Sequence, residues 1–106
     1  MRVVYKKPGH VPEVIDVPNE LRPLQKLVGG YIEVVHLGDD FLMICNEEGK
    51  LKGLEPNIFL LRGTDVEDVV GPIIILNDAG EEFGELTEAE ANLVCKRIGG
   101  SGIWRL

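Results

Sequence analysis

Amide and charged side chains gather in one stretch of the chain, residues 44–57, between two apolar segments. Such side chains line pockets for small polar ligands, because they hydrogen-bond a ligand and fix its orientation. The candidate binding residues are Asn46, Glu48, Lys50, Asn57 and Arg62. One hypothesis is therefore a small-ligand-binding module with a polar pocket near the 46–57 turn. The alternative is turn chemistry, in which the Asn side chains hydrogen-bond to the local backbone.

Acidic side chains dominate the second half of a chain whose net charge is −7. Residues 54–106 carry 4 basic and 10 acidic side chains, and no basic residue lies between Arg62 and Lys96. Such a surface repels phosphate backbones, which argues against direct nucleic-acid binding. It can engage a basic protein partner, or it can serve solubility alone. The candidate acidic interface consists of Asp65, Glu67, Asp68, Asp78, Glu81, Glu82 and Glu85.

Residues that could perform catalysis or bind a metal occur in no recognisable arrangement. Ser101, the only serine, lies in a glycine-rich tail, and the chain has no phosphate-binding loop or nucleophile elbow. Cys45 and Cys95 each follow apolar residues, so we expect small buried hydrophobic side chains. His10 and His36 have no partner at a metal-ligand spacing. We therefore expect a protein that is not an enzyme and holds no metal or cofactor.

The first half of the chain predicts two β-hairpins and one helix. Residues 3–6 and 13–17 are rich in β-forming residues and flank a Pro-Gly turn. Residues 31–37 and 41–46 flank a turn of one glycine and two aspartates, and we expect this second hairpin at the centre of the sheet. Leucines at helical spacing predict a short amphipathic helix over 21–28, which a diglycine can end.

The second half predicts further strands and one more helix. The continuous apolar run at 73–76 fits a strand that is covered on both faces, and residues 82–85 can add a short edge strand. Thr87 and Glu90 have the spacing of a capping box, which opens a helix. The tail at 99–106 is glycine-rich and apolar, and we expect its tryptophan to dock on the body of the protein.

These elements predict an α+β fold in a single domain, residues 1–106. We expect a small mixed or antiparallel sheet of about five to six strands, built from two β-hairpins plus later strands, with two helices packed on it. No segment has the pattern of a signal peptide, and no apolar stretch approaches the about 20 residues that span a bilayer. We therefore expect a cytoplasmic protein with no membrane contact. The run at 73–76 and the tryptophan tail also allow a homodimer.

Two sequence patterns suggest a family. Residues 24–35, LQKLVGGYIEVV, join a helix to a strand, and residues 45–57, CNEEGKLKGLEPN, form the polar turn. Together with an Asp-Val-Val-Gly step at 68–71, they resemble the family described as domain of unknown function 3846. This resemblance covers most of the chain, although Ile58 stands where an arginine or other polar residue is usual. It implies a setting in phages, plasmids and other mobile elements, especially of Gram-positive bacteria, and no established activity.

Two functional hypotheses follow. The first is a non-enzymatic accessory protein of phage or mobile-element type that binds a host or phage macromolecule through the acidic surface. The second is the small-ligand-binding module with its polar pocket near the 46–57 turn. A protein partner is expected in the first case and a small molecule in the second.

Overall fold

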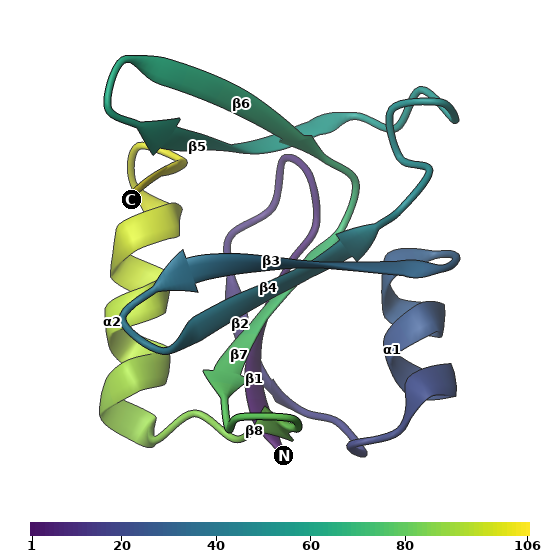
Figure 1. Ribbon diagram of the computed structural model, residues 1–106, viewed down its shortest axis with the longest axis vertical. Coiled ribbons are helices and arrows are strands. Elements are labelled where there is room, and N and C mark those ends of the chain that lie inside the picture. Colours follow the sequence, from purple (N-terminus) through teal and green to yellow (C-terminus); the bar gives the residue numbers. More distant parts are fainter.

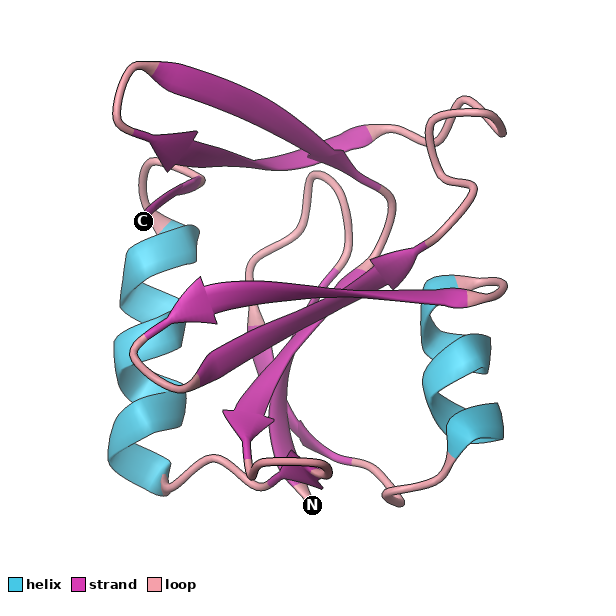
Figure 2. Cartoon of the chain, viewed as in Figure 1, coloured by secondary structure: helices cyan, strands magenta, loops and turns pink.

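The computed structural model describes residues 1–106, which form nine strands and two helices (Figures 1 and 2). In chain order the elements are β1 (Arg2–Lys6), β2 (Glu13–Asp16), α1 (Leu21–Val28), β3 (Ile32–Gly38), β4 (Phe41–Asn46), β5 (Pro56–Arg62), β6 (Asp65–Val70), β7 (Ile73–Asp78), β8 (Phe83–Gly84), α2 (Glu88–Gly99) and β9 (Ile103–Arg105). The strands belong to two separate sheets.

The larger sheet has six strands, in the order β2-β1-β7-β4-β3, with β8 paired to β7. All of its pairs are antiparallel, and the predicted hairpins β1–β2 and β3–β4 are both present. The prediction that the second hairpin is central is wrong, because β3 is an edge strand and β7 lies in the middle. β7 takes that place because residues 73–76 are apolar and fully buried, whereas most of β3 is exposed or half-buried.

The two faces of the larger sheet are covered by different elements, and Figure 1 shows the helices on opposite sides. On one face, Leu24 and Val28 of α1 pack with residues of β4 and β7 such as Ile74. On the other face, α2 and the smaller sheet share a core that includes Val94 and Trp104. The central strands are therefore buried on both faces, as the apolar run predicts.

The smaller sheet has the order β6-β5-β9 and is formed partly by the C-terminal tail. β9 pairs in parallel with β5 and places Trp104 opposite Leu60 in the core, where Trp104 is 1% exposed. The docking of the tail is thus confirmed, but a second sheet was not predicted from the sequence. The α+β class, the six-stranded sheet and the two packed helices are confirmed.

Both helices begin and end where local sequence signals predict. α1 begins at Leu21, which leaves Pro23 in the first turn, and Gly29 ends it with a left-handed φ of 81°. At α2, Thr87 Oγ1 accepts a hydrogen bond from the backbone N–H of Glu90 (3.1 Å), and Glu90 Oε1 accepts one from the N–H of Thr87 (2.9 Å), which is the predicted capping box. Neither helix has the length and apolar character to cross a membrane.

Candidate functional site

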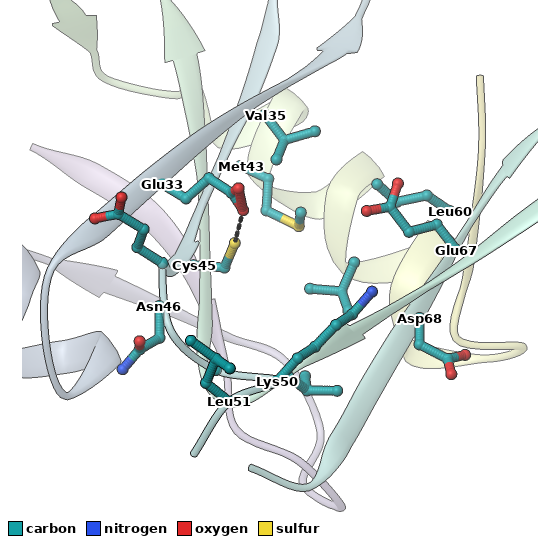
Figure 3. Close-up of a pocket in the computed structure, with 14 residues that line it drawn as sticks. Glu33, Val35, Met43, Cys45, Asn46, Lys50, Leu51, Leu60, Glu67 and Asp68 are labelled. Carbon is teal, nitrogen blue, oxygen red and sulfur yellow. Dashed lines mark hydrogen bonds between the residues drawn. The ribbon is translucent and has the colours of Figure 1, made fainter. Parts of the chain in front are cut away.

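A groove of about 200 Å³ lies between the two sheets, beside the turn that follows β4 (Figure 3). Antiparallel pairing of β3 with β4 places Glu33 opposite Cys45 on one wall, and β6 contributes Glu67 to the other. The lining residues are Glu33, Val35, Met43, Cys45, Asn46, Glu47, Gly49, Lys50, Leu51, Leu60, Glu67, Asp68, Val69 and Val70.

The groove is acidic over an apolar floor. Four acidic residues, Glu33, Glu47, Glu67 and Asp68, belong to its lining, although Figure 3 shows the Asp68 carboxylate pointing outward, and Lys50 is the only cation there. None of the four forms a salt bridge within the chain, and Figure 3 shows Glu33 and Glu67 on opposite walls. All four acidic residues are exposed, so water and salt screen their charges, and the attraction depends on several carboxylates acting on one cation. The groove therefore suits a positively charged group with an aliphatic stem.

Cys45 is the only thiol among the groove residues. Its Sγ donates to Glu33 Oε2 (3.7 Å). Burial and the adjacent Glu33 carboxylate raise the pKa of the thiol from 9.0 to about 12. A thiol with a raised pKa holds very little thiolate at neutral pH, and the thiolate is the nucleophile. The geometry thus places Cys45 among the wall residues, in agreement with its prediction as a buried hydrophobic side chain.

The raised pKa of Cys45 predicts a loss of stability at alkaline pH. Well below pH 9 the thiol is protonated in both the folded and the unfolded protein. Between pH 9 and about 12 the unfolded chain ionises and the folded chain does not, so the free energy of unfolding falls as pH rises through this window. Urea unfolding at successive pH values should show this slope, and Cys45→Ala should reduce it.

Cys95→Ala is the matched control for that measurement. Burial also raises the pKa of Cys95, but this residue is only half-buried on α2, so its replacement should remove less of the slope. Equal slopes in the wild type and in Cys45→Ala would contradict the assignment of the alkaline loss to Cys45.

The structure separates the predicted pocket residues. Asn46 and Lys50 line the groove, whereas Glu48, Asn57 and Arg62 do not. Asn46 is buried, and its side chain donates to the carbonyl of Val28 (3.1 Å) and accepts from the N–H of Glu48 (2.8 Å). The turn interpretation holds for the bond with Glu48, whereas the bond to Val28 connects the turn to the last residue of α1. Arg62 is exposed at the end of β5, away from the groove.

Asn57 connects the two sheets through hydrogen bonds of its side-chain amide. Its Oδ1 accepts from Lys6 Nζ (2.6 Å), and its Nδ2 donates to the carbonyls of Lys6 and Gly71 (both 2.8 Å). One amide thus connects β1, β5 and the link between β6 and β7. Burial lowers the pKa of Lys6, whose ammonium has no carboxylate partner. The prediction of Asn57 as a pocket residue is corrected: its bonding capacity is taken up within the fold.

The predicted acidic residues fall into two groups at opposite ends of the molecule in Figure 1. The first group lies on β6 and consists of Asp65, Glu67 and Asp68. The second lies around β8 and consists of Asp78, Glu81, Glu82 and Glu85. In the second group Asp78 Oδ1 accepts from the N–H of Gly80 (3.0 Å) and Glu85 Oε1 from that of Arg2 (2.9 Å). Only the β6 group contributes to the groove.

Sequence reasoning missed Glu33 and Glu47, which complete the acidic lining. A signal for Glu33 exists, because a lone charge within the β-rich segment 31–37 marks a strand face that is not fully covered. Its proximity to β6 could not be inferred, since the two strands belong to different sheets. No group of three or more His, Cys, Asp and Glu side chains is placed to hold a metal ion.

The fold and the groove define a class: a small α+β protein of two sheets with an acidic groove between them. The family described as Domain of unknown function (DUF3846) matches residues 1–99, and the chain belongs to this family. The resemblance predicted from the two sequence patterns is thereby confirmed. No curated protein and no solved structure matches the chain.

Proposed function

We propose that this chain is a non-enzymatic binding protein that takes up a basic segment of a partner protein in its acidic groove. The observation that carries this proposal is the pair of carboxylates, Glu33 and Glu67, on opposite walls over an apolar floor, with Lys50 as the only cation of the lining (Figure 3). The aliphatic stems of Lys and Arg pack on apolar surface while their charged ends bond to carboxylates. Both parts of such a side chain therefore have a counterpart in the groove.

A small-molecule ligand receives less support. Ligand pockets commonly measure about 300–1,000 Å³ and enclose most of the ligand. The groove measures about 200 Å³, and three of the five residues proposed for a polar pocket lie outside it. An extended peptide needs no enclosed cavity, because it gains contacts along its length.

The biological setting is part of the proposal. The family resemblance implies a setting in phages and other mobile elements. That setting supports an accessory role for the chain, with a host or phage protein of the bacterial cytoplasm as its partner. Residues 73–76 and Trp104, which suggested a homodimer, are buried within one chain, so they supply no motive for self-association. The charge of the groove favours a basic partner over nucleic acid.

Reversing one groove charge should weaken the binding of a basic peptide. The probe is a capped peptide of about seven alternating lysine and threonine residues, a length that matches a typical strand. For Glu67→Lys we expect an affinity at least about tenfold lower, because one attraction is replaced by a repulsion.

The affinity of the wild type should also fall when salt is raised from about 0.1 M to about 1 M, which shortens the Debye length from about 10 Å to about 3 Å. Isothermal titration calorimetry measures both.

Glu81→Lys is the matched control, since it makes the same change in net charge at an exposed acid of the β8 group. It should leave the affinity within about twofold of the wild type, since the β8 group lies at the opposite end of the molecule from β6 in Figure 1 and salt screens distant charges. Equal losses in both variants would mean that only net charge matters and would refute the groove. A peptide of alternating glutamate and threonine should not bind.

A further inference from the structure

We infer that the basic segment binds as an added strand on the free edge of β6. This inference rests on the proposed function and specifies how the partner is held. Strand addition supplies main-chain hydrogen bonds for affinity, while alternate side chains of the added strand enter the neighbouring groove for specificity.

β6 offers an open edge of useful length. It has six residues and pairs only with β5, so its other side carries backbone N–H and C=O groups without a strand partner. Its register with β5 is regular from Asp65 to Val69. Proteins commonly block such edges with charged side chains, especially lysine, with proline or with a bulge on the edge strand. β6, DVEDVV, has no lysine or proline, and its charges are acidic, so they repel acidic strands but attract a basic one. The edge is thus available for pairing.

The groove lies beside that edge. Glu67 is the direct cross-strand partner of Leu60, and both line the groove together with Val69. Neighbouring strands lie about 4.8 Å apart, and side chains on one face of paired strands are within contact of each other. Alternate side chains of a strand added to β6 therefore extend on the same face as Glu67, toward the wall formed by Glu33. Lysine or arginine at those positions meets carboxylates on both walls.

The other edges are poorer acceptors. β2 has four residues and follows Pro12, and β9 has three. β3 borders the same groove and pairs regularly with β4 from Ile32 to His36, but the edge strand itself carries a bulge between His36 and Gly38, whereas the shift in the β5–β6 pair lies on β5. A second copy of this chain is also disfavoured, because pairing β6 with itself sets acidic side chains against one another. Charge complementarity thus selects a basic segment of a different protein.

N-methylation of the lysine–threonine peptide tests the inference. An N-methyl group removes a backbone donor and keeps the side-chain charge. In an extended strand, alternate amides point to opposite sides, so only one alternate set can face β6. We therefore expect one of two peptides, methylated either on the lysines or on the threonines, to bind at least about tenfold more weakly than the parent, and the other to bind nearly as well.

Hydrogen–deuterium exchange on the complex of the parent peptide locates the contact. Strand addition should slow the exchange of β6 amides. If both methylated peptides bind like the parent, or if protection falls on β3 and not on β6, strand addition at β6 is overturned while the charged groove remains as proposed. If the parent peptide does not bind at all, the proposed function fails as well.

Discussion

Trp104→Ala is expected to lower the free energy of unfolding by about 3–5 kcal/mol, the usual range for removal of a buried large aromatic side chain. Trp104 is 1% exposed and contacts three parts of the fold. Its Nε1 donates to the carbonyl of Leu37 (3.0 Å), its ring meets Phe41 edge-to-face at 5.6 Å, and the guanidinium of Arg97 lies 4.7 Å from the ring centroid. Small proteins have a free energy of unfolding of about 5–15 kcal/mol, so this loss can approach the total stability of the protein.

Urea unfolding followed by far-ultraviolet circular dichroism measures the change, since the variant lacks the only tryptophan. Leu106→Ala is the matched control in the same tail, because Leu106 is 44% exposed and keeps its backbone hydrogen bond to Leu61. It should change stability by less than about 0.5 kcal/mol. Trp104→Phe, which keeps a ring and loses the N–H donor, should lie between them. A loss below about 1 kcal/mol for Trp104→Ala would show that β9 is not part of the cooperative core.

Asn57→Leu is expected to cost about 3 kcal/mol or more, because three hydrogen bonds are lost while their partners stay in place. The substitution leaves the Lys6 ammonium and the carbonyls of Lys6 and Gly71 without their Asn57 contacts. A partly buried charge without a partner is among the more costly defects in a protein interior.

A double-mutant cycle isolates this effect. Lys6→Met removes the charge and keeps the aliphatic stem, so Asn57→Leu should cost at least about 1 kcal/mol less in that background. Asn92→Leu, at an exposed position of α2, is the control for the change of residue type. If Asn57→Leu costs no more than Asn92→Leu, or if the cycle shows no coupling, Asn57 does not hold the joint between the sheets.

Local elements of this fold could be predicted because their signals lie within a few residues. The Thr87–Glu90 capping box needs only two residues three positions apart, and Gly29 ends α1 because glycine adopts positive φ without strain. The hairpins follow in the same way from turn residues between β-rich runs. The continuous apolar character of residues 73–76 indicated a strand covered on both faces, and β7 is that strand.

Features that depend on distant residues could not be predicted. β5 reads as a short apolar run, and only pairing with β6 and β9 makes it a strand of a second sheet. Asn57 looked like a pocket residue because its partners, Lys6 and Gly71, come from segments remote in sequence. The acidic residues of the second half form one run in sequence, yet β7 carries the chain from one end of the molecule to the other between the two groups.

The sequence predicted some of the residues that line the groove but not the groove itself. Asn46 and Lys50 were assigned to a polar site because they stand out in a turn between apolar strands. Glu67 was assigned to an acidic interface for its charge. Only part of each hypothesis falls in the groove, Lys50 with Asn46 from the first and Glu67 with Asp68 from the second. Their proximity could not be predicted, since the wall carrying Glu33 and the wall carrying Glu67 belong to different sheets.

The position of β7 in the chain bears on how the protein is made. β7 separates β1 from β4, yet it follows both of them in sequence, so neither strand acquires its central neighbour until residue 78 has left the ribosome. Until then β1 and β4 keep an open edge, and their apolar side chains lack the core of residues 73–76. Folding dominated by such distant pairings is slow, on the order of milliseconds to seconds, and leaves a nascent chain open to aggregation. Truncations that end before β7 should therefore be insoluble, whatever local hairpins they retain.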